Sequence, residues 1–270
     1  MEKVQIEKLK KQVIQNKITL IEMLHESKSG HPGGSLSCMD ILTAIYERKI
    51  DFSKKERSKV VLSKGHAVPA VYSILNSKGI ISDKEILTLR KLNSRLQGHP
   101  SVVKIPELDA STGLLGQGIS IGIGMALAKK QNNSNEKVYV ITGDGELVEG
   151  QNYEALAQAA FYNLDNLIVF VDLNKLCLSG TTKDTMNLGD VDLKFKSFGW
   201  NCIHINGHNM DEICDALDIV DNNKSKPLVI VCDTIKGNGI SFMENDPAWH
   251  GGVITDELYI QAMKELKGAK

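Results

Sequence analysis

The chain has 270 residues, 32 of them basic and 33 acidic, and a formal net charge of −1. This balance argues against a nucleic-acid-binding protein, which usually carries a basic stripe, and we expect no nucleic-acid partner. The proportions of 42% hydrophobic and 24% charged residues are close to average and exclude disorder, collagen and coiled coil. A chain of this length can bury one large core, although length alone allows one or two domains.

The cysteines and the N-terminus indicate the compartment. Five widely spaced cysteines with no CxxC pair are typical of reduced thiols rather than of a zinc or dithiol site. The charged N-terminus lacks the apolar core of a signal peptide, and no apolar run approaches the ~18 residues of a membrane span. We therefore expect a cytoplasmic protein with no membrane partner.

The first 78 residues predict helices separated by two loops that carry histidine. Residues 2–27 place apolar side chains three, four and seven positions apart among lysines and glutamates, as an amphipathic helix requires. This helix should stop at the loop SGHPGG, residues 29–34, and a second helical pattern follows it. The short apolar run 60–62 leads into SKGH, residues 63–66, and then into a helix that reaches about residue 78.

From the middle onward, apolar runs of strand length alternate with helical segments. The runs cover 138–141, 167–171, 200–205 and 228–232, and helices are predicted at 153–161 and 210–220. These runs are too uniformly apolar to have one wet face, which is typical of a parallel sheet. The sequence therefore predicts an α/β fold, a doubly wound parallel sheet with helices on both faces, in a single domain over residues 1–270.

Polar side chains follow two of the predicted strands. The run 138–141 ends in TGDGE, which contains Asp144, and the next run leads to Asn174, 30 residues further on. In such a sheet the ligand lies at the carboxyl ends of the strands, where both side chains could meet. A carboxylate, an amide oxygen and a nearby carbonyl suit Mg²⁺ or Ca²⁺ rather than zinc. GDG alone would fit a turn with a solvated aspartate, but its pairing with Asn174 favours a metal site.

A second glycine-rich stretch, STGLLGQG at residues 111–118, opens a predicted helix that continues to about residue 129. It does not match GxxxxGK[ST], and no GxGxxG lies between a strand and a helix, so a P-loop nucleotide site is not supported. Close packing of the helix is the alternative explanation for these glycines.

Histidine is the remaining chemical signal. His25 and His204 fall in a helix and a strand, where a satisfied structural role is expected. Five others lie in loops rich in glycine or proline: His31, His66, His99, His208 and His250. Any one alone would fit a surface loop. Together they suggest a polar cleft whose imidazoles hold oxygen atoms and move protons near pH 7.

The order of these motifs resembles the thiamine-diphosphate-binding half of a transketolase. The spacing from GDG at 143–145 to Asn174 follows the family's pattern, and Glu149-Gly150 and Leu176 continue it. SGHPG, LSxGH, GHP, TGxLGQG and the final His-Gly also occur in the family's order. The resemblance extends from about residue 4 to residue 252.

The resemblance implies a set of cofactor and metal ligands. Asp144, Asn174 and the carbonyl of Leu176 would hold Mg²⁺ or Ca²⁺ on the diphosphate of thiamine diphosphate. Gly145 and His66 would contact the diphosphate itself.

The remaining residues of the family pattern would complete the cofactor site and the substrate channel. Gly113 and Leu115 would offer main chain to the aminopyrimidine side. Glu149 matches a glutamate at the subunit contact that links cofactor sites. The expected catalytic residues are His31, His66, His99 and His250. Of these, His31, His99 and His250 would line the channel over the thiazolium, hold sugar hydroxyls and shuttle protons, and His250 is also an expected cofactor contact.

The resemblance also implies a partner. Members with one long chain follow this domain with a pyrimidine-binding domain, which carries the glutamate that activates the cofactor, and with a third domain. This sequence stops at Lys270. It is similar to the N-terminal subunit of two-chain transketolases, so we expect a separate C-terminal subunit in an α2β2 heterotetramer, with sugars as small-molecule substrates.

Alternatives remain open at this point. A 1-deoxyxylulose-5-phosphate synthase or a 2-oxo acid dehydrogenase subunit would share the GDG-to-Asn clamp, although the dehydrogenases lack the histidines and TGLLGQG as a set. A non-catalytic partner that binds the cofactor is a third reading. The sequence does not distinguish a phosphosugar, a sulfosugar or a branched sugar as substrate.

Overall fold

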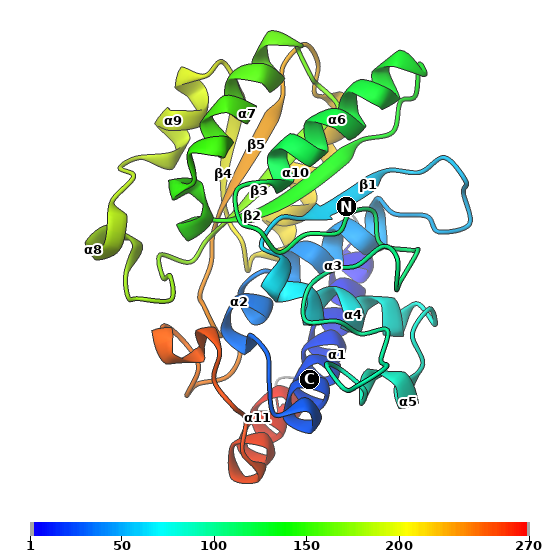
Figure 1. The fold of residues 1–270 in the computed structure, drawn as a ribbon, viewed down its shortest axis with the longest axis vertical. Coiled ribbons are helices and arrows are strands. Elements are labelled where there is room, and N and C mark those ends of the chain that lie inside the picture. Colours follow the sequence, from blue (N-terminus) through cyan, green and yellow to red (C-terminus); the bar gives the residue numbers. More distant parts are fainter. Residues whose placement is uncertain (1–2, 269–270) are drawn as a thin grey trace.

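The computed structural model describes residues 3–268, which are organised around a five-stranded sheet (Figure 1). The strands are β1 (Lys59–Leu62), β2 (Val138–Gly143), β3 (Leu167–Leu173), β4 (Asn201–Asn206) and β5 (Leu228–Asp233). Every neighbouring pair is parallel, and the order across the sheet is β1-β2-β3-β5-β4. The predicted α/β fold with a parallel sheet is confirmed.

Helices cover both faces of this sheet, as predicted (Figure 1). One layer contains α1 (Lys3–Ser27), α3 (Met39–Arg48), α4 (Val68–Ser77) and α10 (Met210–Asn222). The opposite layer contains α6 (Gly118–Gln131), α7 (Gly150–Phe161) and α9 (Val191–Ser197). Shorter helices are α2 (Pro32–Ser37), α5 (Asp83–Ile86) and α8 (Thr182–Met186), and α11 (Asp256–Gly268) packs on α1. Three single turns complete the set: η1 (Gly65–Ala67), η2 (Gly145–Val148) and η3 (Pro247–His250).

The uniformly apolar strands serve two separate cores. On β2, Tyr139 and Ile141 belong to the core shared with α1, α3, α4 and α10, whereas Val138 and Val140 belong to the core under α6 and α7. Successive side chains of a strand point to opposite faces, so a strand buried on both faces must be apolar at every position. The prediction of two-sided burial is confirmed for β2, β3 and β5.

The same prediction is wrong for β4. Among residues 3–268, this strand pairs with β5 alone and lies at the edge of the sheet. Ile205 is its one buried residue, while His204 and Asn206 are exposed and the other three are half-buried. An edge strand lacks a neighbour on one side, and β4 therefore keeps contact with water.

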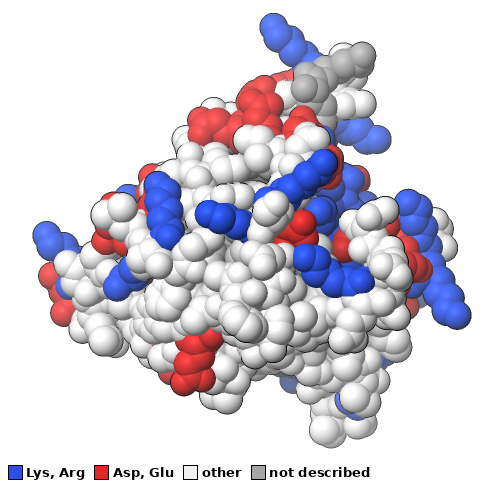
Figure 2. Space-filling view, turned by 90° about the horizontal axis from the view of Figure 1, so that it is seen from above, with Lys and Arg blue, Asp and Glu red and all other residues white. Residues whose placement is uncertain are grey.

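The distribution of charge on the surface agrees with the nearly equal numbers of basic and acidic residues in the sequence. Figure 2 shows basic and acidic side chains intermingled over the upper part of one face and a broad area almost without charge below them. Within residues 3–268, no helix is both long enough and apolar enough to span a membrane. All five cysteines are free, three of them buried, as the sequence predicts for reduced thiols.

Helix α6 approaches the sheet closely because it has glycine at the contact. A Cβ atom on Gly122 would lie 2.6 Å from Cγ2 of Val140 and 3.1 Å from Cδ1 of Leu167, whereas one on Gly124 would meet nothing within 4 Å. Both glycines lie inside the same helix, so they form a matched pair that separates packing from helix propensity.

We expect Gly122→Ala to lower the free energy of unfolding by about 1–3 kcal/mol, since the added methyl group overpacks the contact with the sheet. Gly124→Ala should raise it by up to about 1 kcal/mol, because alanine is the better helix former. Urea unfolding of the two variants measures both effects. Equal effects of the same sign would contradict close packing at Gly122.

Candidate active site

The carboxyl ends of β2 and β3 bring the two predicted metal ligands to one edge of the sheet. Gly143 pairs with Asp172 in register, so Asp144 and Asn174 follow neighbouring strand ends, and both are buried. The Oδ1 atom of Asp144 accepts the Gly145 N–H at 2.7 Å, and Oδ2 accepts the backbone N–H that follows Asn174 at 2.5 Å. Burial and the nearby Asp172 raise the pKa of Asp144 to about 6. The Asp144 carboxylate therefore lacks a positively charged partner in the described residues.

The turn after Asn174 presents the third predicted ligand. Lys175 adopts φ 65°, and the Leu176 N–H donates to Oδ1 of Asn174 at 3.0 Å. The carboxylate, the amide and the turn line one cavity of about 320 Å³. Its wall also includes His66, Leu115, Gly145 and His250. A carboxylate, an amide oxygen and a carbonyl form a hard donor set that fits Mg²⁺ or Ca²⁺.

A buried ion pair lies beneath this cavity. Lys64 donates to the carboxylate of Asp172 and, at 2.9 Å, to the carbonyl of Gly34. Asp172 also accepts the Ser37 hydroxyl at 2.5 Å and the Thr234 hydroxyl. Burial alone would raise the pKa of Asp172, but Lys64 and these hydrogen bonds hold it below its usual value. The pair is balanced in charge and supports the strand ends.

Lys236 also lines the cavity, and the sequence analysis did not identify it. Its side chain is 1% exposed, and Nζ lies 3.4 Å from the carbonyls of Leu176 and Cys177 and 3.2 Å from Nδ1 of His250. In the described part of the chain it forms no ion pair with a carboxylate. Burial and the charge of Lys64 lower the pKa of Lys236 to about 8. Its place just after β5 is the only sequence signal.

Three predicted catalytic histidines form a cluster at the cavity, and two of them, His66 and His250, belong to its wall. The ring centroids of His31 and His66 are 5.1 Å apart, those of His66 and His250 5.1 Å, and those of His31 and His250 5.4 Å. Burial and neighbouring positive charge lower the pKa of His31 and His250 to about 4 and that of His66 to about 2. The rings are therefore neutral at pH 7.

The fourth predicted histidine lies against the glycine-rich loop. A Cβ atom on Gly113, where φ is +149°, would lie 3.2 Å from two ring carbons of His99. Burial and Arg90 lower the pKa of His99. His208 lies apart from the cluster: its Nε2 accepts the Ile235 N–H at 2.8 Å and thus supports the segment that carries Lys236.

Glu146 holds the glycine-rich loop on the strand ends. Its Oε1 accepts the Ser63 hydroxyl and the Gly116 N–H, the latter at 2.8 Å, and Oε2 accepts the Thr142 hydroxyl at 2.8 Å and the Gly143 N–H at 3.2 Å. Each oxygen of Glu146 thus accepts one backbone N–H. If glutamine replaced Glu146, its NH₂ group would face one of these N–H donors in either orientation of the amide.

Glu149, another residue of the predicted site, is exposed beside Gly116 at the start of α7. It does not line the cavity. His31, His99 and Gly113 are likewise outside the cavity lining. The exposed position of Glu149 is compatible with the subunit contact expected from the sequence.

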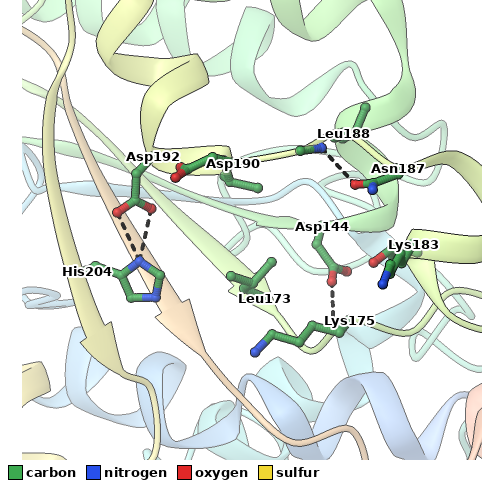
Figure 3. A pocket seen from close by; sticks show the side chains of 12 residues that line it. Asp144, Leu173, Lys175, Lys183, Asn187, Leu188, Asp190, Asp192 and His204 are labelled. Carbon is green, nitrogen blue, oxygen red and sulfur yellow. Dashed lines mark hydrogen bonds and ion pairs between the residues drawn. The ribbon is translucent and has the colours of Figure 1, made fainter.

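Asp144 also lines a second hollow of about 300 Å³ (Figure 3). At its wall, Nδ1 of His204 lies 3.0 Å from both carboxylate oxygens of Asp192, and Nε2 lies 3.0 Å from Asp233. Asp233 in turn pairs with Lys175 at 2.9 Å. The expectation of a satisfied, structural His204 is confirmed, and so is that for His25, which contacts a carboxylate of α11 at 2.8 Å.

Comparison with known proteins identifies the family. The family model "Transketolase, thiamine diphosphate binding domain" matches residues 9–270. The chain belongs to this family. It is 40% identical over 267 residues to an apulose-4-phosphate transketolase subunit of Phocaeicola vulgatus, covering 97% of this chain and 95% of that protein.

Two further relatives extend the comparison. A 6-deoxy-6-sulfo-D-fructose transketolase subunit of Clostridium sp. is 40% identical, with 93% of each chain covered. The crystal structure of transketolase from Campylobacter jejuni superposes with a TM-score of 0.92 at 30% identity, covering 99% of this chain and 43% of that one. The strand ends described above thus lie in a thiamine-diphosphate-binding domain of the transketolase family.

Proposed function

We propose that this chain is the N-terminal subunit of a transketolase and acts in the transfer of a two-carbon ketol unit from a ketose to an aldose. The observation that carries the proposal is the buried Lys236 ammonium, which shares a cavity with Asp144 and Asn174 and has no carboxylate partner within residues 3–268. Buried charges are costly unless they are paired. A diphosphate bound with a divalent metal would pair both the cation and the carboxylate.

The residues at the strand ends fit such a group. Asp144, Asn174 and the carbonyl of Leu176 would hold Mg²⁺ or Ca²⁺, because all three offer hard oxygen donors. Lys236, with His66 and the backbone at Gly145, would hold the diphosphate.

The glycine-rich loop would hold the other end of the cofactor. Gly113 and Leu115 would present main chain to the aminopyrimidine side, and Glu146 keeps this loop in place before any ligand arrives. Pre-positioned backbone of this kind lowers the cost of orientation on binding.

The histidines would act on the sugar. Bound thiamine diphosphate supplies the carbanion and the electron sink. The chain supplies placement and proton transfer: a neutral imidazole can donate its N–H to a sugar oxygen or accept a hydroxyl proton on its bare nitrogen. His31, His99 and His250 would hold the sugar hydroxyls, with His66 nearest the diphosphate.

A partner subunit would complete the active site. Several relatives covered over most of their length are named as transketolase subunits, which supports a separate C-terminal subunit that carries the pyrimidine-binding half in an α2β2 heterotetramer. Their names include a phosphosugar and a sulfosugar, so we propose a ketose with an anionic group as donor. We place the enzyme in the cytoplasm.

We expect ketol transfer only when the chain is combined with a C-terminal transketolase subunit, thiamine diphosphate and Mg²⁺. The assay measures aldose formation from xylulose 5-phosphate and from sulfosugar or branched-sugar donors, with pyruvate as the alternative donor. The two chains assayed separately are the control. Substantial transfer by this chain alone, or turnover of pyruvate in place of every ketose, would contradict the proposal.

Replacement of Lys236 by methionine should weaken binding of thiamine diphosphate roughly 10- to 100-fold, the loss of one charged hydrogen bond, because it removes the ammonium group and keeps an unbranched side chain of similar length. Binding of thiamine, which lacks the diphosphate, should change little. Lys175→Met is the matched control, since this lysine is exposed and paired with Asp233. Equal losses for both ligands would reject a diphosphate contact.

A further inference from the structure

Arg90 lies beside the histidine cluster and contacts the ring of His31. Its Nη2 is 3.4 Å from Nδ1 of His31, and Nη1 donates to the Ser29 hydroxyl at 3.0 Å. Within residues 3–268 no carboxylate forms an ion pair with this guanidinium. Its contacts are thus a hydroxyl and an imidazole from the loop that precedes α2.

The backbone around Arg90 is shaped to hold the guanidinium there. Arg90 itself has φ +59°, a left-handed conformation that is unfavourable for a long side chain, and its N–H donates to the Leu96 carbonyl at 2.9 Å. A Cβ atom on Gly98 would lie 2.9 Å from both Nε and Nη2 of Arg90. The guanidinium therefore lies directly against Gly98, and a side chain at this position would displace it.

Because arginine can only donate hydrogen bonds, its contact with His31 determines which ring nitrogen carries the proton. A guanidinium has only donors, so the ring nitrogen that it contacts must be an acceptor without a proton. We infer that Arg90 is a positioning residue that keeps His31 neutral with its proton on Nε2, as a hydrogen-bond donor for an oxygen atom of the sugar. The role toward the sugar rests on the proposed function, whereas the state of the ring does not.

Two cationic side chains near His31, Arg90 and Lys236, oppose a second proton on its ring. The other titratable neighbours are the imidazoles of His66, His99 and His250. None is a carboxylate. Burial acts in the same direction, and the pKa of His31 falls to about 4. In the described residues no hydrogen bond occupies Nε2 of His31, which leaves this N–H for a ligand.

The geometry at His250 repeats this arrangement. Lys236 places Nζ 3.2 Å from Nδ1 of His250, so a second cation approaches the same nitrogen of a second ring. Since an ammonium also has only donors, the proton of His250 falls on Nε2. The two neutral rings, each with its proton on Nε2, lie 5.4 Å apart, centroid to centroid. Such a pair offers two N–H donors to neighbouring oxygen atoms of a substrate.

The test is histidine NMR on the full chain, without cofactor or partner, labelled with ¹⁵N in the imidazole rings. In the wild type, His31 should show the Nε2–H tautomer and titrate near pH 4. In Arg90→Gln its titration midpoint should rise by roughly one pH unit, because one facing positive charge is lost. Gly98→Ala displaces the guanidinium without removing it and should give a shift of the same sign.

Two further variants serve as controls. Lys91→Gln removes the same charge from the next residue, which pairs with Glu26 at 2.6 Å, and should leave the midpoint of His31 unchanged. Arg90→Lys should retain most of the wild-type behaviour, since it keeps a charged donor. A proton on Nδ1 of His31 in the wild type would overturn the inference, as would an unchanged midpoint in both Arg90→Gln and Gly98→Ala. Neither readout depends on transketolase activity.

Discussion

The buried ion pair between Lys64 and Asp172 is the interaction on which the site depends. It joins the segment after β1 to the end of β3, and Asp172 also binds Ser37 of α2 and Thr234 after β5. Asn174 donates to the same carboxylate at 3.2 Å. Removing one partner of a buried pair typically costs about 3–5 kcal/mol. One carboxylate therefore fixes the relative position of four segments that carry the proposed ligands.

The charges above that pair are not balanced in the same way. Asp144 and Lys236 are both buried, and burial shifts the pKa of each toward neutrality, to about 6 and about 8. Within residues 3–268, neither forms an ion pair with the other or with a third charged side chain. A metal ion on the first and an anionic group near the second would restore the balance. The two residues whose burial costs free energy in the protein alone would therefore stabilise its complex with the cofactor.

Some features of the fold and of the site leave a signal in the sequence, and others do not. The sheet was predictable because strands buried on both faces must be apolar throughout, and Asp144 and Asn174 were predictable because they directly follow such strands. The edge position of β4 was missed because residues 200–205 were grouped with the uniformly apolar runs, although they contain Asn201 and His204. The strand order, with β5 inserted between β3 and β4, places β4 at the edge.

The residues that sequence analysis missed act through contacts that only packing creates. Lys236 and Arg90 each occur in loops without a recognisable motif, and their importance lies in the imidazole nitrogens that they reach. Glu146 stands within GDGE, but its role depends on backbone donors from separate segments of the chain. Spacing along the chain carries no information about such contacts.

Calorimetric titration of thiamine diphosphate into the complex of this chain with the proposed C-terminal partner, with or without Mg²⁺, tests the central claim most directly. The account predicts binding that requires the metal, is abolished by Asp144→Ala and is unchanged by Asp211→Ala, which alters an exposed carboxylate on α10. Unchanged affinity of the Asp144→Ala variant would contradict the placement of the cofactor at these strand ends.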